Sequence, residues 1–210
     1  MYMINGSLFI ILAVICYLIV RGILIGTKNK KHVIWWNEII SFLFVVYICM
    51  VAAVTLFPLP IGFPSNIENL KRSVNIIPFT SIIKDINQIG SAYDGDALFM
   101  IGLIVRNVGG NILLLMPLGF LAPILWGKYT KFKNTILLGF AISVSIELLQ
   151  LIESLFSGWA RVIDIDDVIC NVLGSILGYC IYKIFLKIAT KCNIRVLDKT
   201  NSKGVKLVDK

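Results

Sequence analysis

The sequence has little charge and few acidic residues. Of its 210 residues, 15% are Asp, Glu, Lys or Arg, only 12 are acidic, and 58% are hydrophobic. A water-soluble domain of this size would carry far more apolar surface than it could bury, so the composition argues against one. Together with a mean hydropathy of +0.86, it indicates a membrane protein.

Histidine and paired cysteines are also scarce. The single histidine, His32, lies in a basic stretch, and none of the five cysteines belongs to a C-x-x-C pair. These absences argue against a zinc site and against a histidine-based catalytic triad. We interpret the cysteines as small apolar residues rather than disulfide partners or metal ligands. We predict no metal site and no cofactor.

Five apolar stretches are long enough to cross a bilayer, which takes roughly 20 residues in a helix. They cover residues 8–25, 39–57, 107–125, 135–151 and 168–186. Pro58 and Pro60 end the second stretch, and the polar segment 58–97 that follows has the composition of a loop. We expect residues 97–105 to form a separate short segment on or partly inside the membrane. Two internal prolines should kink the third span.

The sequence therefore predicts an all-α membrane protein, a bundle of about five transmembrane helices. Lys and Arg collect after the first and third spans and near the C-terminus, where eight of the 20 lie between Lys183 and the end of the chain. Because basic loops stay in the cytoplasm, the N-terminus should lie outside and the C-terminus inside. We predict an N-terminal anchor with a basic linker at 1–37, a membrane domain at 38–190 and a basic cytoplasmic tail at 191–210. Such a tail favours anionic lipid over nucleic acid, so the bilayer is the expected partner.

Polar residues inside the spans form three pairs. Members of each pair are three or four residues apart, so they share one face of their helix. The pairs are Asn107 with Asn111, Glu147 with Gln150, and Asp167 with Asn171. The predicted orientation brings all three towards the outer surface. A carboxylate in hydrocarbon is costly, so Glu147 should face the interior and pair with Arg106 or Arg161.

Together these residues predict a polar pocket that opens to the outside. Its expected lining is Asn107, Asn111, Glu147, Gln150, Arg161, Asp164, Asp167 and Asn171. A desolvated Glu147 and a wet Asp164 could act as a general acid and base. The D-I-D-D run at 164–167 carries oxygen ligands of the kind that Mg²⁺ takes, but it matches no complete metal-binding loop. Structural roles are the alternative: helix caps for Asp164, Asp166 and Asp167, interhelical amide bonds and a buried ion pair.

Four motifs follow one another along the chain. They are N-I-I-P-F at 75–79, N-V-G-G-N-I-L-L-L-M-P-L-G-F-L-A-P-I-L at 107–125, S-I-E-L-L-Q-L at 145–151 and R-V-I-D-I-D-D-V-I-C-N-V-L-G-S-I-L-G-Y at 161–179. As an ordered set they resemble the VanZ-like family of integral membrane proteins. The resemblance runs from Thr55 to Tyr179, and the first span lies outside it. The family's polar signature falls on Asn75, Asn111, Glu147, Gln150, Arg161, Asp164, Asp167 and Asn171.

The family is named after a protein associated with low-level resistance to the glycopeptide antibiotic teicoplanin in Gram-positive bacteria. The resemblance implies a multi-pass protein of the cell membrane with a link to antibiotic response or envelope homeostasis, and it implies no reaction. We expect the pocket to bind an envelope lipid or a glycopeptide. The expected binding residues are Asn75, Asn107, Asn111, Gln150, Arg161 and Asn171, and the candidates for a catalytic role are Glu147, Asp164 and Asp167.

Two other functions remain open at this point. One is an intramembrane hydrolase or transferase that acts on a lipid-linked envelope molecule. The other is a structural or partner-binding membrane module whose polar cluster is satisfied internally and adjoins no cavity.

Overall fold

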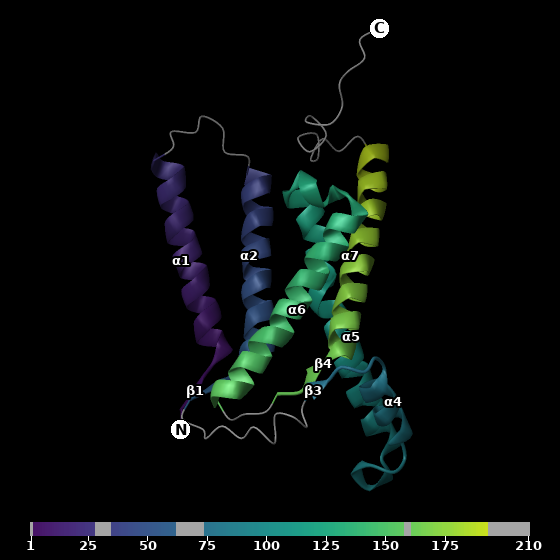
Figure 1. Cartoon of the computed structure of the whole chain (residues 1–210). Helices are drawn as coiled ribbons and strands as arrows, with labels where there is room; N and C mark the ends of the chain where they lie inside the picture. The colour runs from purple at the N-terminus through teal and green to yellow at the C-terminus, as the bar shows by residue number, and fades with distance from the viewer. Residues whose placement is uncertain (1, 28–34, 62–73, 158–160, 193–210) are drawn as a thin grey trace.

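The computed structural model describes residues 2–27, 35–61, 74–157 and 161–192. Within them, five helices are long and apolar enough to span a membrane: α1 (Gly6–Thr27), α2 (Trp35–Leu56), α5 (Ala97–Leu125), α6 (Phe132–Ser157) and α7 (Ile165–Lys191). The predicted all-α bundle of five spans is confirmed. β1 (Tyr2–Ile4) and the C-terminal end of α7 lie at opposite ends of the bundle (Figure 1). The basic linker that contains His32 and the tail beyond Cys192 lie outside the described residues.

α5 is a single helix where the sequence predicted two segments. It begins after Asp96, whose Oδ1 accepts a hydrogen bond from the backbone N–H of Phe99 at 2.9 Å. The helix then continues without a break through the R-N-V-G-G-N run, so the predicted separate segment at 97–105 is wrong. A glycine inside a helix costs only about 1 kcal/mol, which packing against neighbouring helices offsets. The two internal prolines also lie within this one helix.

α5 and α7 pack backbone to backbone at the centre of the bundle. A Cβ atom added at Gly174 would lie 1.9 Å from the carbonyl oxygen of Ile112, and one at Gly178 would lie 1.9 Å from that of Met116. Only glycine permits so close an approach, and small residues commonly line helix interfaces in membranes. Leu115, between the two contact points on α5, is fully buried. This closely packed pair of helices carries Asn107 and Asn111 on α5 and Asp167 and Asn171 on α7.

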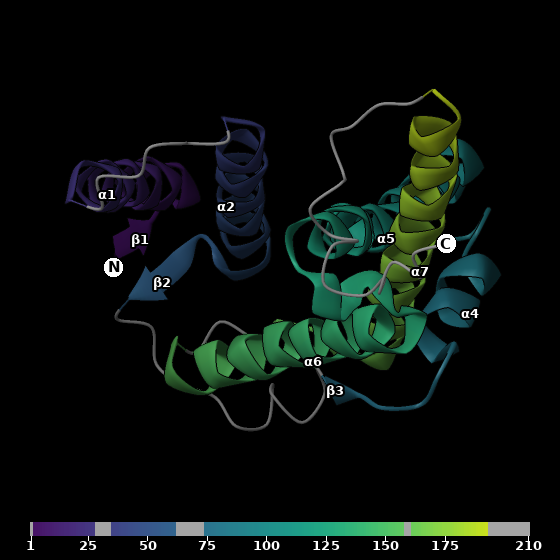
Figure 2. The same ribbon diagram turned by 90° about the horizontal axis from the view of Figure 1, so that it is seen from above.

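α6 crosses the bundle obliquely and connects α2 with α5 and α7 (Figures 1 and 2). Near its start, the carbonyl oxygen of Thr135 accepts a hydrogen bond from Ser175 Oγ of α7 at 3.5 Å. Near its end, Gln150 Nε2 donates to the carbonyl oxygen of Thr55 in α2 at 2.8 Å. α1 packs against α2 and has no buried residue. α6 therefore makes polar contacts with α7 near its start and with α2 near its end.

The segment between α2 and α5, predicted as a loop, contains regular structure. β2 (Leu59–Ile61) pairs antiparallel with β1, and β3 (Val74–Asn75) pairs parallel with β4 (Ile163–Asp164). α4 (Thr80–Asn87) follows β3 and lies beside the start of α7 (Figure 1). Two short 3-10 helices, η1 (Tyr93–Gly95) and η2 (Gly127–Thr130), complete the described elements. Strands this short leave no periodic pattern in the sequence, which is why the composition indicated only a loop.

Candidate functional site

Asp164 joins three elements where β4 meets α7. Its backbone N–H donates to Glu147 Oε2 of α6 at 3.2 Å, and its Oδ1 accepts from Asn75 Nδ2 at 2.9 Å. The same oxygen accepts from the backbone N–H of Asp166 at 3.0 Å, which makes Asp164 the N-cap of α7. Asp164 and Glu147 are only 6% and 7% exposed. Glu147 is therefore buried as expected, whereas the prediction of a wet Asp164 is wrong, because Asp164 is buried as well.

Asp166 is buried as well, although the sequence suggested a solvated or helix-capping residue. It is 3% exposed, and its Oδ1 accepts a hydrogen bond from the backbone N–H of Phe79 at 2.5 Å. Phe79 is the N-cap residue of α4 and has a φ of 65°. The carboxylate of one helix thus satisfies a free donor at the start of another. Within the described residues, its second oxygen, Oδ2, has no hydrogen-bond partner.

Of the polar pairs predicted on α5 and α7, one residue from each is in contact with the other helix. Asn111 Nδ2 donates to Asp167 Oδ1 and so links the two helices. Asn171, one turn further along α7, donates instead to Ser143 Oγ of α6 at 3.0 Å and is 1% exposed. Asn107, one turn before Asn111, is exposed. The shared face on each helix was predicted from spacing, but the two residues of α7 have partners on different helices.

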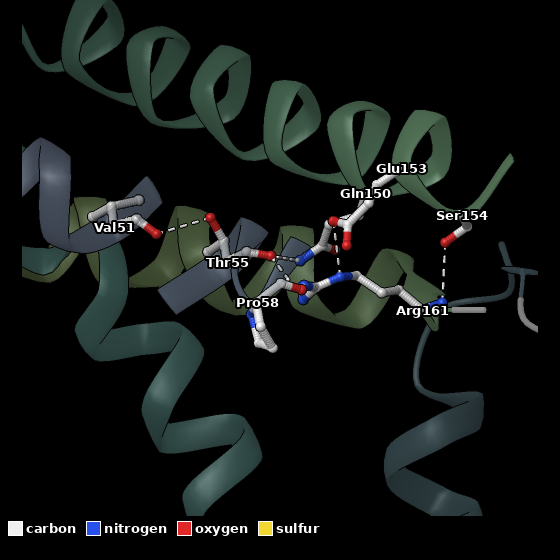
Figure 3. Close-up of polar contacts among 7 residues, drawn as sticks. All are labelled: Val51, Thr55, Pro58, Gln150, Glu153, Ser154 and Arg161. Carbon is white, nitrogen blue, oxygen red and sulfur yellow. Dashed lines mark hydrogen bonds and ion pairs between the residues drawn. The ribbon is translucent and has the colours of Figure 1, made fainter. Parts of the chain in front are cut away.

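Arg161 pairs with Glu153, not with Glu147 as the sequence suggested. Its Nε lies 2.9 Å from Glu153 Oε2, and its guanidinium reaches towards the end of α2 (Figure 3). Nη1 donates to the carbonyl oxygen of Thr55 at 3.0 Å, and Nη2 donates to that of Pro58 at 3.5 Å. Carbonyls at a helix C-terminus lack helical donors and attract cations. Arg161 therefore fastens the end of α2 to α6.

The end of α6 explains why this pairing was missed. The sequence placed the end of the fourth span at residue 151, which left Glu153 in a loop. α6 continues to Ser157, and the side chain of Glu153 is 6% exposed. Ser154 Oγ accepts from the backbone N–H of Arg161 at 3.0 Å, which holds the arginine in place. Glu147 receives its hydrogen bond from the backbone of Asp164 rather than from an arginine.

A cavity of about 720 Å³ lies between α4, α5, the end of α2 and the start of α7. Five of the predicted site residues line it: Asn107, Asn111, Gln150, Asp164 and Asp167. Four are not among the lining residues: Asn75, Glu147, Arg161 and Asn171. Asn75 and Glu147 each contact Asp164, so they support the wall rather than form it.

Several lining residues were not predicted. They are Ser81, Lys84, Asp85, Arg106 and Asp166, three of them on α4. A signal for α4 was present, because the T-S-I-I-K-D-I-N run at 80–87 can place its isoleucines on one face of a helix. Arg106 was considered as a partner for Glu147, but it forms no ion pair within the described part of the chain.

The VanZ/LLP1 family model matches residues 44–186. The match begins inside α2, ends inside α7 and includes every residue of the polar cluster and the cavity. The chain belongs to the VanZ/LLP1 family. α1 lies outside the residues that match the VanZ/LLP1 family model, in agreement with the sequence motifs, which also excluded the first span. No curated protein matches the chain, and no solved structure matches it.

In this VanZ/LLP1 protein, the carboxylates near the start of α7 are hydrogen-bonded within the chain rather than arranged as metal ligands. Among the described residues, no three His, Cys, Asp or Glu side chains are arranged to hold a metal ion. Oδ1 of Asp164, Asp166 and Asp167 each accept at least one hydrogen bond from the chain itself. The arrangement can offer the remaining carboxylate oxygens, two cations and three amides to a ligand in the cavity.

Proposed function

We propose that this VanZ/LLP1 protein binds the headgroup of an envelope lipid in the cavity between α4, α5 and α7. We further propose that this binding lowers the susceptibility of the cell to glycopeptide antibiotics of the teicoplanin type. The observation that carries the proposal is the cavity itself, which holds about 720 Å³ and is lined by charged residues of both signs. Pockets for small ligands measure about 300–1,000 Å³. The link to glycopeptides rests on the resemblance to the family's namesake.

The size and position of the cavity favour a lipid over a whole glycopeptide. A glycosylated peptide antibiotic is larger than the drug-sized ligands that fill a pocket of this volume. A lipid needs to place only its headgroup there. The lining also includes the apolar side chains of Ile104, Val108 and Leu114 of α5, beside which the first part of an acyl chain can lie.

The geometry gives less support to an intramembrane enzyme that uses Glu147 as its base. Glu147 Oε2 accepts a hydrogen bond from the backbone N–H of Asp164, and Glu147 is not among the residues that line the cavity. A general base must come within hydrogen-bonding distance of the proton that it removes. A structural module without a ligand site predicts no cavity beside the polar cluster, so the cavity supports binding instead.

A susceptibility assay tests the proposed function. A glycopeptide-susceptible Gram-positive host would express the wild-type chain, the double variant Lys84→Gln/Arg106→Gln, or the control Lys128→Gln. Lys84 and Arg106 are exposed residues of the cavity, whereas Lys128 is an exposed residue of η2 and is not part of its lining. Wild type and control should raise the inhibitory concentration of teicoplanin, and the double variant should not.

Membrane content of each variant is measured in the same cells, because a poorly inserted protein would imitate the expected loss. Lipids that remain bound after purification are identified by mass spectrometry. The proposal fails if the double variant inserts normally, protects as well as the wild type and retains the same lipids.

A further inference from the structure

We propose that the cavity selects a headgroup that carries both a phosphate and a primary amine, with the phosphate beside Lys84 and Arg106 and the amine beside Asp166 and Asp167. This inference rests on the proposed function and specifies the chemical class of its ligand. It follows from the charges, free hydrogen-bonding atoms and side-chain types that line the cavity.

Two cations of the cavity are available to an anion. Lys84 extends from α4 and Arg106 from α5, and both are exposed. Across the residues that the structure describes, neither takes part in an ion pair or a side-chain hydrogen bond. Guanidinium and ammonium groups bind phosphate oxygens through charge-assisted hydrogen bonds. Two helices thus present phosphate-binding groups to one cavity.

The acidic side of the cavity has carboxylate oxygens that receive no hydrogen bond from the described residues. Asp166 is 3% exposed, lines the cavity, and has a buried Oδ2 that receives no hydrogen bond from the described chain. Asp167 also lines the cavity, and Asn111 donates to only one of its oxygens. A buried acceptor without a donor is unfavourable. A ligand that brings N–H donors and a positive charge would satisfy both carboxylates.

A primary ammonium fits this side better than other cationic groups. It carries three N–H donors in a compact volume, whereas a trimethylated ammonium has none and is usually recognised by aromatic rings. None of the described residues that line the cavity is aromatic. Four carboxylates line it, those of Asp85, Asp164, Asp166 and Asp167, against two cations. The excess negative charge favours a ligand whose innermost group is positive.

The order of groups in an ethanolamine-type headgroup agrees with the order of the charged residues from the buried to the exposed side of the cavity. The amine is terminal and would reach the buried Asp166. The phosphate follows and would lie by the exposed Lys84 and Arg106, and the acyl chains would leave the cavity into the bilayer.

The first test uses the full wild-type chain in nanodiscs and four lipids with identical acyl chains. Their headgroups are ethanolamine, N-methylethanolamine, N,N-dimethylethanolamine and choline, so the N–H donors are removed one at a time. Binding is measured by native mass spectrometry. We expect binding to weaken along the series, with the ethanolamine lipid binding about tenfold more tightly than the choline lipid, as for the loss of one charged hydrogen bond. A phosphatidylglycerol lipid, which has no amine, should bind no better than the choline lipid.

Variants separate the two halves of the site. Asp167→Asn should remove most of the preference for ethanolamine over choline, and it keeps an oxygen that can accept from Asn111. Lys84→Gln/Arg106→Gln should weaken all phosphate lipids by a similar factor and keep that preference. Lys128→Gln should match the wild type. Asp166 is left unchanged because it also holds α4.

The outcomes distinguish this inference from the proposed function. Equal binding of the ethanolamine, choline and glycerol lipids would overturn the selection for an amine while leaving lipid binding intact. Binding of no lipid would overturn both. Free O-phosphoethanolamine should compete only weakly, because it lacks the acyl chains. If free O-phosphoethanolamine bound as tightly as the lipid, the ligand would be a soluble phosphoamine and not a lipid headgroup.

Discussion

The carboxylate of Asp166 in α7 accepts a hydrogen bond from the backbone N–H of Phe79 at 2.5 Å, although the two residues are 87 positions apart. Through this bond, the first turn of a spanning helix holds the start of the short helix α4. A second connection lies close by, because Asn75 Nδ2 donates both to Ser81 Oγ of α4 and to Asp164 Oδ1. α4 supplies one wall of the cavity, so these bonds help to hold that wall in place.

Replacing Asp166 should release α4. Asp166→Ala removes the acceptor for the backbone N–H of Phe79, and leaving such a donor unpaired costs about 1–3 kcal/mol. Asp166→Asn retains an acceptor oxygen and should preserve most of the attachment. Hydrogen exchange of the amides of Thr80–Asn87 measures the effect. Faster exchange in the alanine variant, with near wild-type exchange in the asparagine variant, is expected, and identical exchange in all three proteins would contradict the anchoring role.

Gly174 and Gly178 should tolerate no side chain. An alanine methyl group at either position would lie 1.9 Å from a carbonyl oxygen of α5, so α5 and α7 would have to separate, at a cost of about 1–3 kcal/mol for overpacking. Gly109→Ala is the matched control, because an added Cβ atom there has nothing within 4 Å. Thermal unfolding in detergent should show a lower midpoint for Gly174→Ala and Gly178→Ala. If Gly109→Ala lowers the unfolding midpoint by as much, close packing at Gly174 and Gly178 is not the cause of the loss.

Arg161 should matter for stability through Glu153. Arg161→Met leaves the carboxylate of Glu153, whose side chain is 6% exposed, without its cation, and such a change typically costs about 3–5 kcal/mol. The double variant Arg161→Met/Glu153→Met removes both charges and should recover much of the loss. The three proteins are compared by their unfolding midpoints in the same detergent. If the double variant is less stable than Arg161→Met alone, the ion pair is not the source of the effect.

The bond between Asn111 and Asp167 should give a measurable coupling energy. A double-mutant cycle with Asn111→Ala and Asp167→Ala isolates it from other contacts. Polar contacts between membrane helices average about 0.6 kcal/mol and reach about 1.7 kcal/mol, and we expect a value in that range. A second cycle that combines Asn111→Ala with Asp96→Ala at the start of α5 serves as the reference. Its coupling should be near zero, and equal couplings in both cycles would count against a specific bond.

The predicted orientation can be read from cysteine labelling. On a background without the five native cysteines, Ser91→Cys and Lys131→Cys place single thiols at exposed positions on either side of α5. Because Lys and Arg collect near residue 131, that side is expected in the cytoplasm. A membrane-impermeant maleimide should label Ser91→Cys in intact cells and Lys131→Cys only after permeabilisation. The reverse pattern would invert the topology and place the cavity near the inner surface.

Several features were predictable because they depend on short stretches of sequence. The five spans follow from the length of apolar runs, and the family follows from motifs in a fixed order. Gly174 and Gly178 are four residues apart on one helix, a spacing typical of close helix packing in membranes, and each lies against a carbonyl oxygen of α5. The predicted break before the third span failed, because a pair of glycines does not overcome the packing of a long helix.

The partners of the charged residues were not predictable in the same way. Arg161 was one of two candidate partners for Glu147 because the short loop put it within reach, whereas the extension of α6 to Ser157 brings Glu153 to it instead. The role of Asp166 depends on where α4 folds, and α4 lies in a segment whose composition indicated only a loop.

The sequence by itself determined that the chain is a five-span membrane protein of the VanZ/LLP1 family and which residue types gather near one end of its helices. These properties follow from local composition, spacing and order. Only the tertiary structure decided which carboxylate meets which donor and where a cavity remains. The physical reason is that each buried charge takes the nearest partner that the packed helices allow, and that partner is set by helix length, register and the position of α4 rather than by distance along the chain.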